Sequence, residues 1–323
     1  MTSHEPVVLL LTDPATGHAW PGHPERPERV EAVAAGFAEG AREGGARLER
    51  GSAPPVSLDL VRRVHDPAYV DWLVARAAGG AAWIDADTYV VEGSPFAAWR
   101  AAGMASAAAQ AVVRGEATVA FAAVRPPGHH ANHDQGKGFC LVNNVAIAVA
   151  CLREADAAAR IAILDWDVHH GDGTQAIFAA DPDVFYASTH QSPWYPGSGS
   201  TTERTRTLLN APLVAGSGDE AFLAAWRDGI LPAVEEFRPH VLLVSAGYDA
   251  HADDPLAGLM VTATGFEAVA REVGRLARGL GLGGVALVLE GGYDLDALRS
   301  SAAATVEGLL DSLGPPAIRV PRT

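Results

Sequence analysis

Cysteine is scarce in this sequence: the 323 residues include only Cys140 and Cys151. Two cysteines cannot build the disulfide framework on which small secreted proteins depend, so the sequence favours a reducing compartment. The first apolar run, residues 7–11, has no basic lead and is too short for a signal peptide. No apolar run approaches the roughly 18 residues needed to cross a bilayer. We therefore expect a cytoplasmic protein without a membrane partner.

Basic residues are also few: 24 lysines and arginines stand against 39 aspartates and glutamates, which makes the net charge −15. Affinity for nucleic acid comes mostly from Lys and Arg contacts to phosphate, so this balance predicts no nucleic-acid partner. The sequence also lacks a long Gly/Ser or Pro linker and any internal repeat. We expect one domain that spans residues 1–323.

Short apolar runs recur along the chain, and helical segments alternate with them. Runs that are apolar at every position predict strands buried on both faces, as in a parallel sheet. The predicted strands are Val7–Thr12, Thr118–Val124, Ile161–Asp165, Val184–Ser188, Val241–Ser245 and Val285–Leu289. Strands that alternate with helices indicate an α/β fold.

Local signals mark the starts of several helices. The pair Asp66-Pro67 is typical of a helix start, and a second helix is expected over residues 94–115. The segment Thr264–Glu267 matches a capping box. Asp219 is expected to cap the helix that contains residues 221–227.

Polar clusters follow five of the predicted strands directly. They are RPPGHH (125–130), DWDVHHGDG (165–173), STH (188–190), AGYDAHADDP (246–255) and EGGYDLD (290–296). Open parallel sheets bind ligands outside the carboxyl ends of their strands. The five clusters therefore predict one composite site.

Asp167 and His169 carry the strongest metal signal. They are two residues apart, so in an extended segment both side chains point the same way. A catalytic zinc takes three protein ligands and keeps one position open, and Asp249 is the candidate third ligand. The alternative for an isolated Asp-x-His is a structural ion pair, which the neighbouring Asp165 and Asp172 make the weaker interpretation.

The tandem pair His129-His130 suits acid–base work near neutral pH. Asp165 and Asp172 remain available to hydrogen-bond one imidazole each and set its tautomer. Tyr293 would donate a hydrogen bond to a polarised carbonyl oxygen. Each of these residues has a plain structural alternative, as part of a turn or as packing. Their shared place at the strand ends favours catalysis.

Six motifs resemble, in order, those of the zinc-dependent histone deacetylase family: GHPERPERVEAV, RPPGHH, GFCLVNN, LDWDVHHGDGTQ, SAGYDAHADDPL and LEGGYDLD. The resemblance spans about residues 17–300. The family includes bacterial histone-deacetylase-like amidohydrolases, acetylpolyamine amidohydrolases and acetoin-utilisation proteins. It implies the single-domain arginase–deacetylase fold, an α/β fold with a central, mostly parallel eight-stranded sheet flanked by helices.

The resemblance implies a role for each catalytic residue. Zinc would be held by Asp167, His169 and Asp249. His130 would be the general base that activates water and then protonates the leaving amine, with His129 as its electrostatic partner. The supporting residues would be Asp165 for His129, Asp172 for His130 and Tyr293 for the acyl oxygen.

The resemblance also implies a structural potassium ion and a substrate tunnel. The potassium would be bound by Asp165, Ser188 and the backbone carbonyls of Asp167, His169 and Thr189. The tunnel walls would be Gly138, Phe139 and Tyr195, with Leu256 at the tunnel's edge and Asp87 at its rim holding the substrate backbone. Arg29 resembles the arginine of an internal channel.

Two features bear on the substrate. Family branches with His in place of the tyrosine have weak deacetylase activity, whereas this chain has Tyr293. The acetylpolyamine branch carries an early insertion that narrows the site, and the stretch between Asp87 and Phe96 is too short for it. The resemblance therefore implies removal of an acyl group, with acetyl preferred, from lysine side chains of a protein or peptide. A small acylated amine stays open as the substrate, and so does homo-oligomerisation.

Two other functions compete with this one. The arginase branch shares the fold but uses two manganese ions, and the tandem histidines and Tyr293 argue against it. A non-catalytic acyl-lysine-binding protein should have lost a ligand or the tyrosine, and both are present. We assign no chemistry to His170, although it lies beside His169.

Overall fold

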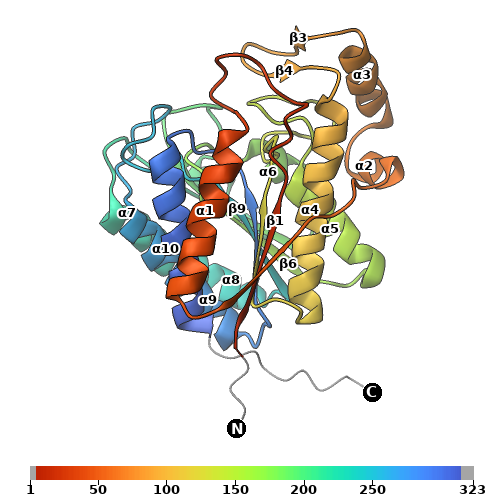
Figure 1. Cartoon of the computed structure of the whole chain (residues 1–323). Helices are drawn as coiled ribbons and strands as arrows, with labels where there is room; N and C mark the ends of the chain where they lie inside the picture. Colours follow the sequence, from red (N-terminus) through yellow and green to blue (C-terminus); the bar gives the residue numbers. More distant parts are fainter. Residues whose placement is uncertain (1–4, 314–323) are drawn as a thin grey trace.

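The computed structural model describes residues 5–313, which form a central sheet between two layers of helices (Figure 1). The eight strands lie in the order β2-β1-β5-β10-β9-β6-β7-β8, and all neighbours are parallel. Their bounds are β1 Val7–Thr12, β2 Arg47–Gly51, β5 Val119–Ala123, β6 Ile161–Asp165, β7 Val184–Gln191, β8 Leu208–Leu213, β9 Val241–Ala246 and β10 Val285–Leu289. The predicted α/β class and eight-stranded parallel sheet are confirmed.

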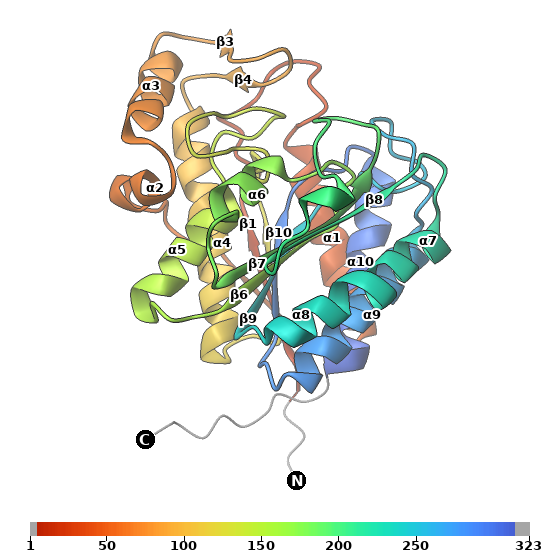
Figure 2. The same ribbon diagram turned by 180° about the vertical axis from the view of Figure 1, so that it is seen from behind.

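Each face of the sheet is covered by its own helical layer (Figures 1 and 2). One layer contains α2 (Leu58–Val64), α3 (Pro67–Ala78), α4 (Ser94–Arg114) and α5 (Asn144–Ala155). The other contains α1 (Glu28–Glu43), α7 (Asp219–Ala224), α8 (Leu231–Phe237), α9 (Ala263–Gly279) and α10 (Leu295–Leu313). Within the described residues, every helix is too short or too polar to span a lipid bilayer.

The strands supply side chains to both cores in alternation. Ile161 and Ile163 of β6 pack in the core beside α4 and α5, whereas Ala162 and Leu164 pack in the core beside α9 and α10. Successive side chains of a strand point to opposite faces, so a strand buried on both faces must be apolar throughout. This is the pattern from which the strands were predicted.

The predicted strands agree with the structure at the centre of the sheet and miss its edges. Three of the six match residue for residue, and the other three differ only at their ends. The edge strands β2, with sequence RLERG, and β8, with sequence LLNAPL, were not predicted. Each pairs with only one neighbour, β1 or β7. Neither sequence has the unbroken apolar run from which the central strands were predicted.

Two helix starts differ from the expectation. Thr262 is the N-cap of α9, so Thr264–Glu267 is not a capping box. Asp219 is the first residue of α7, and its carboxylate accepts hydrogen bonds from the backbone N–H and hydroxyl of Thr262 instead of capping its own helix. Residues 225–230 continue as a π-helix. The start at Asp66-Pro67 is as predicted, because the Asp66 carboxylate accepts from the N–H of Ala68.

Candidate metal centre and catalytic site

The candidate site lies where four adjacent strands end. β5, β10, β9 and β6 are neighbours in the sheet and run in the same direction, so the segments that follow them meet at one edge. β6 is followed by Asp167 and His169, β9 by Asp249, β10 by Tyr293 and β5 by the tandem histidines. Four of the five predicted clusters therefore meet at this edge, whereas the fifth, residues 188–190, lies within β7 and not after it.

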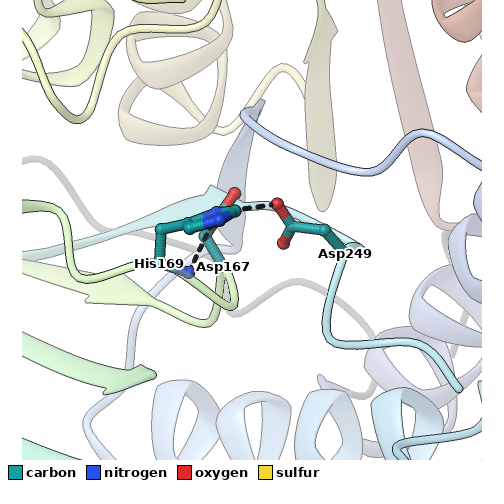
Figure 3. Close-up of side chains that lie close together, drawn as sticks. All are labelled: Asp167, His169 and Asp249. Carbon is teal, nitrogen blue, oxygen red and sulfur yellow. Dashed lines mark hydrogen bonds and ion pairs between the residues drawn. The ribbon is translucent and has the colours of Figure 1, made fainter. Parts of the chain in front are cut away.

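Asp167, His169 and Asp249 form a compact set of metal donors (Figure 3). His169 Nδ1 lies 3.1 Å from Asp167 Oδ1 and 3.1 Å from Asp249 Oδ2. Both carboxylates are buried. Gly247 and Gly291 leave room for them, because a methyl group added at either glycine would collide with a ligand carboxylate.

This donor set fits a zinc ion. Metal–ligand bonds of about 2.0–2.1 Å at tetrahedral angles separate ligand atoms by roughly 3.3 Å, close to the 3.1 Å separations of His169 Nδ1 from the two carboxylates. Burial acts to lower the pKa of His169, but hydrogen bonds to Asp167 and Asp249 outweigh it and raise this pKa to about 10. Two buried carboxylates side by side are unfavourable unless a positive charge lies between them, and a bound metal cation would supply that charge.

Each of the tandem histidines has its own carboxylate. His129 Nδ1 lies 3.0 Å from Asp165 Oδ2, and His130 Nδ1 lies 2.9 Å from Asp172 Oδ1, at the start of α6 (Asp172–Phe178). With the Nδ1 proton donated to the carboxylate, Nε2 of each ring is the nitrogen left to gain or lose a proton.

The environments of the two histidines push their pKa values apart. Burial acts to lower both. For His129 the charges of Asp167 and Asp165 prevail, and its pKa lies well above the usual range. For His130, burial and the neighbouring charge of His129 lower the pKa to about 3 against the pull of Asp172. These environments favour the charged form of His129 and the neutral form of His130.

A cavity of about 240 Å³ opens onto these residues. It is lined by Asp87, Pro127, His129, His130, Gly138, Phe139, Asp167, His169, Trp194, Tyr195, Leu256, Gly291 and Tyr293. All five residues named from the sequence as tunnel or rim residues are in this set. Trp194 and Tyr195 are partly exposed, so the mouth has an aromatic edge.

Tyr293 is buried at the wall of this cavity. Its backbone N–H donates to Asp254 Oδ2 at 2.6 Å, and its ring meets Phe139 edge-on with centroids 5.7 Å apart. The guanidinium of Arg29 lies 4.8 Å from the ring centroid and donates to the Gly292 carbonyl. Burial raises the pKa of Tyr293 well above its ordinary range, so the phenol stays protonated.

The residues named for potassium lie close to the catalytic carboxylates. Asp165 is fully buried, and its Oδ2 accepts hydrogen bonds from His129 and from the Tyr186 hydroxyl at 3.0 Å. The Ser188 hydroxyl lies 2.9 Å from His190 Nδ1. Thr189 is buried, and among the described residues its hydroxyl has no hydrogen-bond partner.

The comparison with protein families matches residues 23–309 to the histone deacetylase domain. This chain belongs to the histone deacetylase family. The resemblance inferred from the six motifs is confirmed, and membership supports a hydrolase of the deacetylase and amidohydrolase group.

Three relatives illustrate the family. The histone deacetylase-like amidohydrolase of Pseudomonas aeruginosa is 39% identical over 270 residues, which cover 82% of this chain and 71% of that protein. The crystal structure of the HDA15 HD domain has a TM-score of 0.87 at 33% identity and covers 97% of this chain and 90% of its own. An acetylpolyamine aminohydrolase from Burkholderia pseudomallei has a TM-score of 0.81 at 31% identity and covers 94% and 98%.

Within this deacetylase fold, Glu290 is a site residue that the sequence reasoning missed. Its buried carboxylate accepts hydrogen bonds from the backbone N–H of Gly128 at 2.6 Å and of His129 at 3.0 Å, and from the Ser245 hydroxyl at 3.1 Å. It thereby holds the segment that carries the tandem histidines. The signal was available: Glu290 is a charge directly after a buried strand, the feature that singled out the residues after β6.

Proposed function

We propose that this protein is a zinc-dependent amidohydrolase that removes acyl groups, acetyl first, from lysine side chains. The main support is that the metal donors Asp167, His169 and Asp249 lie beside two histidines. Each histidine is paired with an aspartate, and their environments shift the two pKa values in opposite directions. Metal-assisted amide hydrolysis needs a site that binds a metal ion, a neutral base to accept a proton from water, and a positive charge near the developing oxyanion. The donor set, His130 and His129 supply these in turn.

The donors Asp167, His169 and Asp249 would hold the zinc. When bound, zinc supplies Lewis acidity toward water and toward the acyl oxygen. The neutral His130 takes the proton of the attacking water at Nε2. The protonated His129 lends positive charge to the developing oxyanion, and Tyr293 donates a hydrogen bond to it. His130 then passes its proton to the amine nitrogen, the C–N bond breaks, and the carboxylic acid and the free amine leave.

The cavity favours a long, slender acylated chain. Phe139 and Tyr195 are aromatic walls, Gly138 leaves space against the ring of His130, and the exposed Asp87 stands at the rim. An acyl-lysine side chain has an apolar stem that such walls would enclose, and a rim carboxylate would accept from the peptide N–H groups. An acetylated polyamine is the alternative, because the Burkholderia relative of similar fold bears that name.

Four further expectations remain proposals. A structural potassium ion would bind at Asp165, Ser188 and the backbone carbonyls of Asp167, His169 and Thr189. Residues 1–323 would form a single domain, located in the cytoplasm. The protein would act without nucleic-acid or membrane partners. Self-association stays open.

The deciding experiment is a metal and substrate panel. Chelator-treated protein should have no turnover, and one equivalent of zinc should restore hydrolysis of an acetyl-lysine peptide. Longer acyl-lysines and acetylpolyamines in the same assay identify the preferred substrate. Turnover that requires two manganese ions, or the absence of turnover on every acylated amine by zinc-loaded protein, would overturn the proposal.

A further inference from the structure

Lys137 is the only lysine among the 323 residues, which contain 23 arginines, and it lies at the candidate active site. Its ammonium forms an ion pair with Asp172 Oδ2. The other oxygen of the same carboxylate, Oδ1, lies 2.9 Å from His130 Nδ1. One carboxylate therefore joins this lysine to the imidazole assigned above as the base.

A tight turn presents Lys137 to Asp172. The N–H of Cys140 donates to the carbonyl of Lys137 at 3.0 Å, and the two central residues, Gly138 and Phe139, both have positive φ angles of 55° and 70°. Two consecutive left-handed residues are typical of a type I′ turn. The same turn places Phe139 in the wall of the cavity. Lys137 thus has two candidate tasks: to act on Asp172 or merely to anchor this wall.

The contacts of Asp172 favour the first task. Its side chain is 16% exposed and that of Lys137 is 23% exposed, so solvent screens their ion pair only in part. Burial acts to raise the pKa of Asp172, but hydrogen bonds from His130 and Lys137 prevail and lower it to about 2. Each carboxylate oxygen has one fixed partner, which prevents the group from rotating away from the His130 ring.

We propose that Lys137 is a positioning residue that holds Asp172 in the orientation and charge state in which it supports His130. Asp172 then keeps the proton of His130 on Nδ1 and leaves Nε2 free to accept a proton from water. The proposal rests on the proposed function and extends the histidine–aspartate pair to a chain of three residues. Arginine, which is abundant elsewhere, could replace the charge, so the K137R variant serves as the conservative rescue.

The first test is a double-mutant cycle with kcat and KM measured separately. We expect K137M to lower kcat by about 10–100-fold, as loss of an outer-shell partner does, with KM unchanged. K137R should recover most of kcat, and K137M should cost nothing further in the D172N background. A rise in KM at constant kcat, or additive effects with D172N, would assign Lys137 to the wall and overturn the proposal. R50M, which removes an exposed positive charge on β2, is the charge-matched control and should behave like the wild type.

The second test needs no turnover and so separates this proposal from the proposed function. Lys137 is the only side-chain amine, so an N-hydroxysuccinimide ester can label only it and the N-terminus. Mass spectrometry gives the labelling rate at Lys137 in the folded wild-type and D172N proteins. The two melting temperatures are compared first, to show that D172N is as well folded as the wild type. We expect Lys137 to label severalfold faster in D172N, because its amine is then no longer held in an ion pair with a carboxylate. Equal rates would show that the lysine is not held by Asp172 and would overturn the proposal.

Discussion

Tyr293 combines a packed ring with a phenol whose raised pKa keeps it a hydrogen-bond donor at neutral pH. Burial raises its pKa, and the nearby charges of Asp249 and Asp167 add to this effect against Arg29. Tyr293→Phe keeps the ring contacts with Phe139 and Arg29 and removes only the donor. We expect kcat to fall by about 100–1,000-fold, the usual cost of one oxyanion donor. Turnover near the wild-type level would disprove the assigned role.

The measurement for Tyr293→Phe needs a metal control. Zinc content per chain should equal that of the wild type, because the donor atoms belong to the segments after β6 and β9 and not to Tyr293. The melting temperature should change little for the same reason. A variant that has lost zinc would leave turnover uninformative about the phenol, so kcat is compared only between fully loaded proteins.

At the residue scale, residue type and spacing were enough to bring the metal donors and the tandem histidines together in one expected site. They were not enough for Glu290, Asp254 and Lys137. Glu290 and Asp254 bind backbone N–H groups of other segments, and Lys137 pairs with a residue 35 positions away. Such partners depend on how the loops run in three dimensions, which a local sequence pattern cannot predict.

At the scale of elements, the central strands were predictable because burial on both faces requires an unbroken apolar run. The edge strands β2 and β8 were not, because an edge strand has half its backbone and much of its surface outside the sheet. Asp219 misled the prediction for a related reason: its sequence context suits a helix cap, but tertiary structure brings it to Thr262. Propensity is a weak prior that such contacts override.

The contact between α1 and α10 yields a prediction about two glycines. Gly36 and Gly40 lie one helical turn apart on α1, and a methyl group at either would strike backbone atoms of Arg299 or Ala303 on α10. Gly→Ala in a helix normally stabilises by up to about 1 kcal/mol. Overpacking against rigid backbone costs about 1–3 kcal/mol, so the collision should prevail. We expect Gly40→Ala to lower the free energy of unfolding in a denaturant titration.

The matched control is Gly229→Ala, also in a helical segment but with open space around the added methyl group. This variant should be as stable as the wild type or slightly more so. If Gly40→Ala were also stabilising, the close approach of the two helices would be carried by something other than the small residues at this crossing.

At the scale of the whole molecule, a buried ion cluster ties the N-terminal segment to the end of β5. The Glu25 carboxylate accepts from Arg125 Nε at 2.7 Å and Nη2 at 2.6 Å, and from Arg29 Nη1 at 3.1 Å. Arg125 also donates to the carbonyls of Pro14 and Ala15. Removing one partner of such a cluster strands the other charges in the interior, which typically costs about 3–5 kcal/mol.

This cluster predicts how stability should depend on pH. Burial acts to raise the pKa of Glu25, but the charge and hydrogen bonds of Arg125 prevail and lower it from 4.5 to about 2. A carboxyl group with a lower pKa in the folded state stabilises the fold above its unfolded pKa. That contribution, on the order of 3 kcal/mol, is lost as the pH falls from about 4.5 to about 2. The stability difference between wild type and Glu25→Gln should therefore be largest at neutral pH and shrink across this window.

Denaturant titrations of both proteins at a series of pH values measure this difference and cancel the titration of carboxyl groups that the two share. Glu154→Gln is the control, because Glu154 pairs with Arg63 at the surface, where an ion pair contributes about 0–1 kcal/mol. Its stability difference should be small and nearly flat with pH. If the Glu25→Gln difference were equally flat with pH, the pKa of Glu25 would be the same in the folded and unfolded states. The arginines would then hold the N-terminal segment through its backbone carbonyls alone.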